Sequence, residues 1–264
     1  MDGRDWNKFL IPYEQAVEEL KVKFRSIRKE LKKRSEYSPI EFVTGRVKQV
    51  SSILEKSKKL AIPLDRLEEE MEDIAGIRIM CQFVEDIERV VNHIRQRNDF
   101  TIAYEKDYVN HQKTSGYRSY HIVIRYPLQT IYGEKEILAE IQIRTLAMNF
   151  WATIEHSLNY KYKQQLPEPI QERLRKAAEA AFQLDREMST IREEIMDAQM
   201  MFANKSDLMA TTLNRIQELY ASGHVEEAQT IQEQFMQLWV AEDMTAIYIL
   251  YQHLNQRIEE IKQI

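Results

Sequence analysis

The sequence predicts an α+β fold in which a mixed central β-sheet is flanked by helices at the N- and C-terminal ends of the chain. Apolar residues recur at three- and four-residue spacing near the start of the chain and again from Leu146 onward, as in amphipathic helices. Short segments between them read as strands. With 264 residues, of which 44% are apolar, the chain can form one sizeable domain or one domain and an appendage.

The N-terminal part is expected to hold two helices, one at 5–34 and one that opens at Pro39 and runs to about 59, because Pro63 marks the break after it. The acidic segment 64–71 is also expected to be helical. Strands are expected near 76–83, 101–107, 119–126 and 136–143, with a helix at 86–97 and a hairpin turn at 131–135.

Beyond the last strand the pattern is helical to the end, with breaks at two prolines, at the polar segment 204–206 and at Gly223. We therefore expect one domain at 1–203, made of the sheet and its flanking helices, and a helical extension at 204–264. The extension reads as two or three amphipathic helices that turn at Gly223 and near Asp243.

Charge is distributed unevenly, although the net charge is only −5. Residues 21–34 carry eight Lys or Arg side chains and one acid, which suits ligands that bear phosphates. Residues 206–264 carry nine acids and three cations, so this segment is not expected to contact nucleic acid.

Several protein classes are excluded. No run of about 18 apolar residues is present, so we expect no membrane span, and the N-terminus lacks the pattern of a secretion signal. The lone Cys81 stands in an apolar strand and reads as a small buried hydrophobe, which excludes disulfides and cysteine-bound zinc. These features fit a cytoplasmic protein.

The strongest functional signal is the strand that ends at Thr145. Ile141 and Ile143 point to one face of this strand, and its other face carries Glu140, Gln142 and Arg144. A central strand that lines its second face with an acid, an amide and a guanidinium indicates a site. Asp73 precedes another strand, and a carboxylate pair with Glu140 could bind Mg²⁺ or accept a hydroxyl proton. Either acid alone could equally be structural.

Two further segments carry suitable groups. On a helix, Lys48, Ser52 and Lys56 would form one polar stripe, and movable ammonium groups suit a polyphosphate, although a solvated helix face would look the same. Tyr117 follows Gly116 and could stack on a purine, and His121 could donate to a phosphate or ribose. A core tyrosine and a structural histidine are the alternatives.

Together these segments resemble a known family. The patterns that occur in the order and spacing of the (p)ppGpp synthetase domain of the RelA/SpoT homologues are Arg46-x-Lys48-x3-Ser52-x3-Lys56, Asp73-Ile-Ala-Gly-x-Arg78, Gly116-Tyr117-x-Ser119-x-His121 and Glu140-Ile-Gln-Ile-Arg-Thr145. The chain is most similar to the single-domain small alarmone synthetases of the RelQ type, over roughly residues 5–200.

The resemblance implies a sheet of the nucleotidyltransferase-like synthetase type and the activity of a GTP pyrophosphokinase. Such an enzyme transfers the β,γ-diphosphate of ATP to the 3′-hydroxyl of GTP or GDP, with Mg²⁺ as cofactor, and makes pppGpp or ppGpp. Longer members also carry a hydrolase domain with a His-Asp motif. No His-Asp dipeptide occurs here, so synthesis without hydrolysis is expected.

The resemblance also implies roles for individual residues. Asp73 and Glu140 would be the catalytic and metal-binding pair. The ATP site would comprise Arg46, Lys48, Ser52, Lys56 and Arg78, with the two arginines against the adenine. The acceptor site would comprise Tyr117, stacked on guanine, with His121, Gln142, Asn149, Lys113 and Lys106.

In RelQ-type relatives, copies of the chain meet at a central cleft where pppGpp can bind and stimulate synthesis. The resemblance therefore implies a homo-oligomer, a tetramer, and an allosteric site for pppGpp. Its residues would be Lys21, Arg25, Arg28, Glu41, Phe42 and Thr44. The three cations are spaced i, i+4 and i+7 and so share one helix face.

Functions of other classes remain open at this stage. The basic helix at 21–34 could serve an RNA-binding regulatory module, and single-stranded RNA is a possible partner. A nucleotidyltransferase that extends RNA usually places two acids one residue apart on one strand, a pattern absent around Asp73. An interaction scaffold would account for the extension but for none of the four patterns.

Overall fold

The computed structural model describes residues 5–161 and 166–262, and the chain divides into two compact units, Met1–Thr190 and Ile191–Ile264. The division falls within one long helix, α6 (Glu168–Ala221). The expected boundary at 203/204 lies in the same helix. Each unit is described by itself below.

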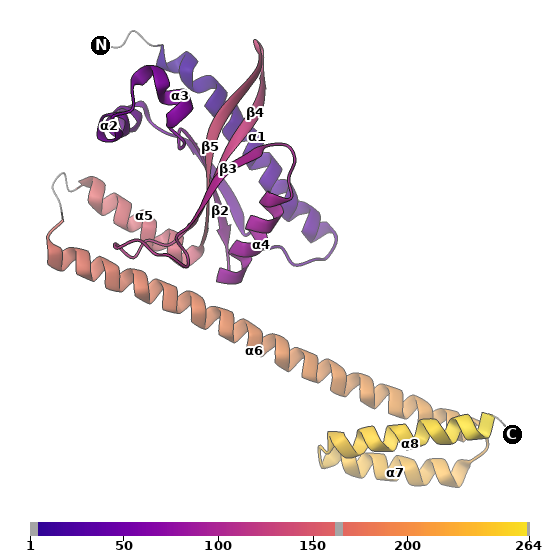
Figure 1. Cartoon of the computed structure of the whole chain (residues 1–264). Helices are drawn as coiled ribbons and strands as arrows, with labels where there is room; N and C mark the ends of the chain where they lie inside the picture. Colours follow the sequence, from indigo (N-terminus) through magenta and orange to yellow (C-terminus); the bar gives the residue numbers. More distant parts are fainter. Residues whose placement is uncertain (1–4, 162–165, 263–264) are drawn as a thin grey trace. The chain divides into compact units, whose positions relative to one another are not determined.

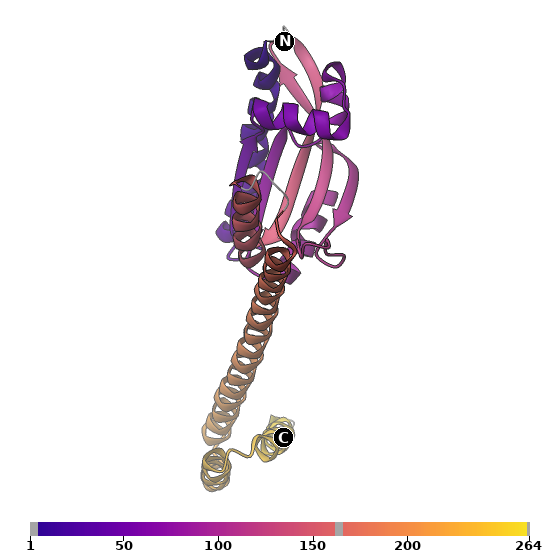
Figure 2. The same cartoon turned by 90° about the vertical axis from the view of Figure 1, so that its left-hand side faces the viewer.

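The first unit is built on a five-stranded sheet of β1 (Phe42–Val47), β2 (Ala75–Cys81), β3 (Thr101–Asp107), β4 (Tyr120–Thr130) and β5 (Gly133–Thr145). Their order is β1-β2-β5-β4-β3; β2 and β5 run parallel and the other neighbours antiparallel. This confirms the predicted mixed sheet within an α+β fold. The hairpin of β4 and β5 forms a long ribbon (Figure 2).

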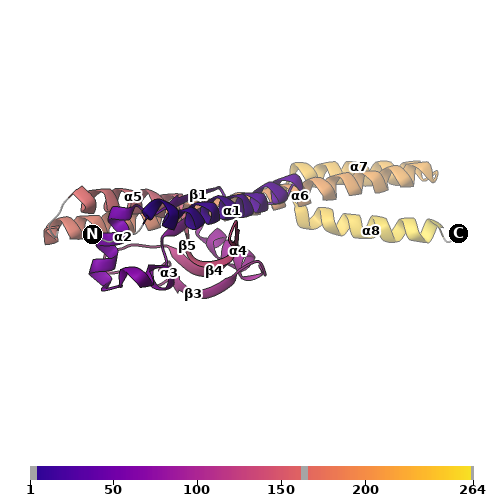
Figure 3. The same ribbon diagram turned by 90° about the horizontal axis from the view of Figure 1, so that it is seen from above.

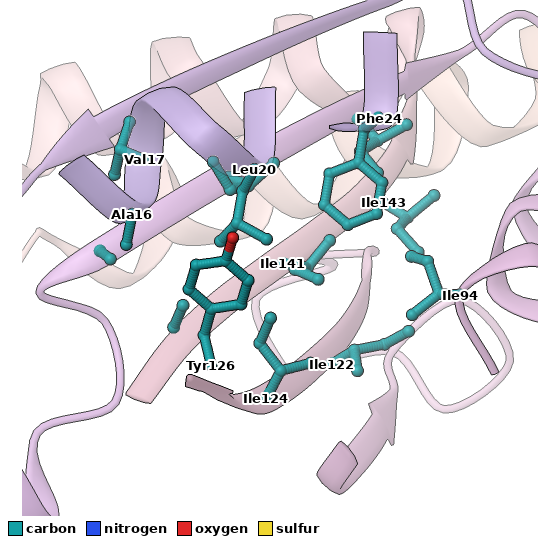
Figure 4. Packing of buried hydrophobic residues seen from close by; sticks show 14 of the residues in the cluster. Ala16, Val17, Leu20, Phe24, Ile94, Ile122, Ile124, Tyr126, Ile141 and Ile143 are labelled. Atoms are coloured by element: carbon teal, nitrogen blue, oxygen red, sulfur yellow. The ribbon is translucent and has the colours of Figure 1, made fainter. Parts of the chain in front are cut away.

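The apolar face of the sheet packs against α1 (Trp6–Lys33) and α4 (Val84–Arg95). α1 contributes a row of fully buried side chains, including Tyr13, Leu20 and Phe24. Leu20 and Phe24 meet isoleucines of β4 and β5, as Figure 4 shows, because alternate residues of a strand share one face. The alternation thus leaves the polar residues of β5 on the opposite face.

Helical segments flank that opposite face at its ends. They are α2 (Val50–Leu60), the 3₁₀ turn η1 (Leu64–Arg66), α3 (Leu67–Glu70) and α5 (Leu146–Lys161) (Figure 1). Residues of β1, α2 and α5 line a common groove there. The expected helices at 5–34 and 86–97 and the hairpin turn at 131–135 agree with the structure within a few residues.

Two expectations are wrong. The segment expected as one helix from Pro39 to about 59 contains β1, whose alternation of buried Val43 with exposed Phe42 and Thr44 suits an edge strand. As a consequence Lys48 precedes α2, and no helical stripe joins it to Lys56. The expected break at 204–206 is also absent, because α6 continues through it; a short polar stretch is compatible with an exposed helix.

The second unit consists of the end of α6, α7 (Val225–Val240) and α8 (Met244–Lys262), and Figure 3 shows α7 beside α8. Its core is formed by Ile216, Leu219, Ala228, Phe235, Ile247, Leu250, Leu254 and Ile258. The turns at Gly223 and near Asp243 lie where the sequence predicts them, and Gly223 has a positive φ of 89°. None of the helices in the described residues is both long and apolar enough to cross a membrane.

Asp185 gives a stability prediction within the first unit. Its carboxylate is 5% exposed and accepts the Thr145 hydroxyl at 2.5 Å, while burial and the neighbouring Glu85 raise its pKa to about 6. Because the pKa is raised on folding from 3.8, this group favours the folded state fully below pH 3.8 and loses that contribution as pH rises through 6. The charge therefore destabilises the protein at neutral pH.

Asp185→Asn keeps an acceptor for Thr145 without the charge. We expect it to raise the melting temperature by several degrees at pH 8, with a gain of at most about 3 kcal/mol, and we expect the difference to vanish near pH 4. Thermal unfolding at pH 4, 6 and 8 checks this. A lower melting temperature of the variant at every pH would contradict this prediction, because it would show that the carboxylate of Asp185 stabilises the protein.

Candidate active site

The open face of the sheet aligns polar residues from all five strands. In the strand register, Thr44 lies opposite Arg78, Arg78 opposite Gln142, Gln142 opposite His121 and His121 opposite Lys106. Residues opposite one another in neighbouring strands share a face. One row across the sheet thus gathers residues that lie up to 98 positions apart in the chain, from Thr44 to Gln142.

Two positions further along the strands, Arg46 lies opposite Gly76, and Gly76 lies opposite Glu140. Because Gly76 has no side chain, the space between Arg46 and Glu140 remains open. A cavity of about 120 Å³ occupies this place, lined by Arg46, Arg78, Glu140, Gln142 and Asp73 among others. The structure therefore brings together the two acids that the sequence singled out.

Asp73 lies in the turn before β2, at the edge of this cavity. Its Oδ2 pairs with Nζ of Lys48 at 2.8 Å and with Nζ of Lys56 at 2.9 Å. Its Oδ1 is buried and has no hydrogen-bond partner among the described residues. A buried carboxylate oxygen without a partner is costly, and a ligand or metal ion could satisfy it.

Glu140 is held in its ionised form. Burial favours the neutral acid, but the hydrogen bonds from His121 and Gln142 outweigh burial and lower the pKa of Glu140 to about 2. His121 Nδ1 lies 2.8 Å from Oε1, and Gln142 Nε2 donates to Oε2 at 2.7 Å. A carboxylate so placed carries a fixed negative charge throughout the neutral pH range.

Three guanidinium groups surround the acids. Burial lowers the pKa values of Arg78 and Arg144, and repulsion from Arg46 lowers them further. Cations packed this closely are costly unless anions bind among them. This region is therefore suited to phosphate groups or to the face of a base.

Tyr117 is presented by a tight loop between β3 and β4. The N–H of Gly116 donates to the carbonyl of Lys113 at 2.8 Å, and Gly116 has a φ of +87°. A Cβ on Gly116 would lie 2.6 Å from Cβ of Ala178, so only glycine fits there. The Lys113 ammonium lies 5.0 Å from the centre of the Tyr117 ring and 4.5 Å from that of Tyr108.

The expected phosphate-binding residues line a larger groove of about 1070 Å³ beside the cavity. Arg46, Lys48, Ser52 and Lys56 lie on one side, and residues of α5, including His156, lie on the other. Lys48 joins this group through its ion pair with Asp73 rather than through a shared helix face. The groove and the cavity share Arg46 as a lining residue, so they are adjacent.

Lys106 lies at the end of the polar row, on the edge strand β3. Lys106 donates to the Tyr104 hydroxyl at 3.2 Å, and that hydroxyl bonds Glu72. Asn149 is half-buried on α5 and makes no hydrogen bond to the site residues within the described part of the chain.

The expected effector residues gather between α1 and the edge strand β1. Arg25 donates to the Val43 carbonyl at 2.9 Å and Arg28 pairs with Glu41 at 3.3 Å, while Lys21 pairs with Glu18. Since these cations of the basic helix already have partners, the case for an RNA-binding face is weakened. Phe42 is 40% exposed.

The sequence places Arg144 on the polar face of β5 but assigns it no role, and it does not indicate Tyr108 as a member of the site. Arg144 donates to the Tyr117 hydroxyl at 3.0 Å and to Oε1 of Gln142. Tyr108 packs edge-on against His121, with ring centres 5.3 Å apart. The period-two pattern that places Arg144 beside Glu140 and Gln142 was a signal for the first, whereas the sequence carries none for the second.

Comparison with known proteins agrees with this geometry. Residues 45–165 match the model of the region found in RelA/SpoT proteins. GTP pyrophosphokinase YjbM of Bacillus subtilis is 59% identical over 205 residues, which cover 78% of this chain and 97% of that protein.

Two solved structures are similar as well. The small alarmone synthetase 1 of Bacillus subtilis bound to its product pppGpp aligns with a TM-score of 0.70 and 60% identity, over 72% of this chain and 97% of that one. The same synthetase bound to AMPCPP aligns with a TM-score of 0.64 and 57% identity, over 73% of this chain and 98% of that one. With relatives this similar along nearly their whole length, the chain belongs to the RelA/SpoT family and, within it, to the small alarmone synthetases.

Proposed function

We propose that this protein is a GTP pyrophosphokinase that transfers the β,γ-diphosphate of ATP to the 3′-hydroxyl of GTP or GDP, releasing AMP. The observation that carries the proposal is the cavity where Asp73 and Glu140 face Arg46 and Arg78 at the end of a cationic groove. The product named for the similar synthetase, pppGpp, is the product that this reaction gives with GTP. Synthesis is the only activity proposed.

The two nucleotides would bind at different places. ATP would lie along the groove, with its phosphates beside Lys48, Ser52 and Lys56. Its adenine would reach the cavity, between Arg46 and Arg78. The acceptor would lie toward the loop, with guanine on the Tyr117 ring and Gln142 and His121 near its ribose. Lys113, Lys106 and Asn149 are the further candidates for acceptor contacts.

The residues present fit Mg²⁺. Asp73 offers a buried oxygen without a partner, and Glu140 is ionised. No cage of three or more acidic, His or Cys side chains occurs in residues 5–161 and 166–262, so the ion would take its other ligands from phosphates and water. When bound, Mg²⁺ would neutralise charge on the transferred diphosphate.

The protein's own groups would position the reactants. The 3′-oxygen forms the new bond to the β-phosphorus as the bond from that phosphorus to the α-phosphate oxygen breaks. AMP leaves with that oxygen, and the hydroxyl proton is released to solvent. Glu140 would accept the hydrogen bond of the 3′-hydroxyl and orient its lone pair, since a carboxylate with a pKa of about 2 is a weak base. Phosphoryl-type transfer depends chiefly on such alignment and charge neutralisation.

Incubation of the full chain with labelled ATP and either GTP or GDP, followed by chromatography, tests this function. We expect AMP and a 3′-diphosphorylated guanine nucleotide in equal amounts, and no reaction without Mg²⁺. Formation of ADP and phosphate instead, or no turnover with either acceptor, would contradict the proposal. The chemistry is assigned to 1–203, and the segment 204–264 is assigned no part in it.

We also propose a homotetramer in which pppGpp stimulates synthesis at the junction of α1 and β1. The support is the cluster of Arg28, Glu41 and exposed Phe42, two residues from Thr44, which lines the catalytic cavity. Lys21 and Arg25 lie on the same helix. An effector that binds the active state better by about 1–3 kcal/mol suffices for such coupling.

Progress curves test this regulation. We expect an initial lag that added pppGpp removes, and a Phe42→Ala, Arg28→Ala variant that has lost the stimulation while its basal rate remains. Lys29→Ala, Lys32→Ala on the same helix is the matched control and should respond as the native protein does. Linear curves that pppGpp leaves unchanged would contradict the effector site.

A further inference from the structure

Five side chains of the site form a closed ring of hydrogen bonds. Arg144 donates to the Tyr117 hydroxyl at 3.0 Å, which lies 2.8 Å from His121 Nε2, and His121 Nδ1 lies 2.8 Å from Glu140. Gln142 then links Glu140 at 2.7 Å back to Arg144. This ring of hydrogen bonds connects β5, which carries Glu140, to the loop that carries Tyr117.

Arg144 sets the direction of these bonds. A guanidinium can only donate, so both Tyr117 Oη and Gln142 Oε1 must accept from it. The Tyr117 hydrogen is then left for His121 Nε2, and the amide nitrogen of Gln142 is left for Glu140. His121 therefore carries its hydrogen on Nδ1, where it donates to the carboxylate.

The surroundings of Arg144 favour a role beyond packing. Arg144 is 3% exposed, and its Nε has no hydrogen-bond partner among the described residues. Its Nη2 donates to two neutral oxygens, those of Tyr117 and Gln142. A buried guanidinium with no direct carboxylate partner is costly, and an apolar side chain of similar volume would pack at a lower cost. The positive charge of Arg144 therefore lowers the stability of the folded protein.

We propose that Arg144 is a positioning residue of the acceptor site, which fixes the Tyr117 ring against β5 and orients Gln142 toward Glu140. Without it, Tyr117 would lose the hydrogen bond and the cation–π contact that tie it to β5, and would keep its hydrogen bond to His121 of β4. This inference rests on the proposed function, because it concerns the site of the guanine nucleotide. It predicts an effect on the acceptor that ATP does not share.

The first test separates the two substrates kinetically. Arg144→Met should raise the KM for the guanine nucleotide about 5- to 20-fold and lower kcat about 10- to 100-fold, the range found when an outer partner of a site residue is lost. The KM for ATP should stay within about twofold. Arg144→Lys, which keeps a donor and the charge, should recover part of the lost affinity.

Arg118→Met is the matched control. Arg118 is adjacent to Tyr117 and largely buried. It donates to the Val109 carbonyl and stacks on Phe182, and neither contact belongs to the ring of five hydrogen-bonded side chains. We expect this control to lower the melting temperature without changing the ratio of the two KM values. A shift of the ratio in both variants would indicate a general loosening of the loop and would overturn the inference.

A double-mutant cycle with Tyr117→Phe provides the second test. The phenylalanine keeps the ring for stacking but removes the hydroxyl through which Arg144 acts. If the inference holds, the effects of Arg144→Met and Tyr117→Phe on guanine-nucleotide affinity, measured by calorimetry, are not additive. Additive effects, or equal losses of ATP and guanine-nucleotide binding, would overturn it. A native chain that forms no product would overturn the proposed function and this inference together.

Discussion

Glu140→Gln is expected to reduce kcat by at least about 1000-fold, roughly 4 kcal/mol of barrier, while the fold remains intact. The carboxylate accepts N–H groups from His121 and Gln142 and is the fixed negative charge of the cavity. An amide in its place would turn one acceptor oxygen into a donor that faces another donor. It would neither orient the 3′-hydroxyl nor bind a metal ion.

The measurement is single-turnover conversion of labelled ATP, with thermal unfolding as the check on folding. Glu136→Gln is the matched control, because Glu136 lies on the same strand, is exposed and pairs with Arg125 at 3.2 Å. This control should keep native activity. Activity of Glu140→Gln within about tenfold of native, a difference of about 1.4 kcal/mol, would remove Glu140 from its assigned role.

Asp73→Asn is expected to lower activity at least about 100-fold and to raise the Mg²⁺ concentration needed for half-maximal rate. The substitution removes the charge that holds Lys48 and Lys56 at the cavity, and it weakens the oxygen ligands available to the ion. Both losses act on the triphosphate, so ATP binding should suffer more than binding of the acceptor.

Magnesium titration of the rate and calorimetry with each nucleotide check this expectation. Asp65→Asn, an exposed acid in η1, serves as the control and should behave as the native protein. An unchanged magnesium dependence in Asp73→Asn would show that the metal is held elsewhere. If the variant loses binding of the acceptor but not of ATP, Asp73 acts at the acceptor site and its assignment to ATP is wrong.

Much of the fold was readable because its signals are local. The alternation around Ile141 and Ile143 and the helical spacing of Tyr13, Leu20 and Phe24 each describe one element and its buried face. β1 was missed because six residues with exposed Phe42, Thr44 and an arginine resemble the polar side of a helix as much as an edge strand. The segment is a strand because it pairs with β2, and a pattern within six residues does not reveal a partner that lies far along the chain.

The site was predictable as a set of residues but not as an arrangement. The patterns around Asp73 and Glu140 indicated carboxylates that work together, yet only the sheet register places both beside one cavity. The partners of Arg144 were likewise hidden. Its spacing placed it on one face with Glu140 and Gln142, and the structure gives it Tyr117 and Gln142 as hydrogen-bond partners. Such choices depend on side chains from distant segments.

The strand order has a consequence for how such an enzyme can change over evolutionary time. β5 has a neighbour on each side, so the carboxylate of Glu140 is anchored in the part of the sheet that tolerates change least. Tyr117 belongs to a surface connection next to the outermost strand, β3, where substitutions and insertions are accepted more readily. Selection can therefore retune the choice of acceptor nucleotide without disturbing the machinery that transfers the diphosphate.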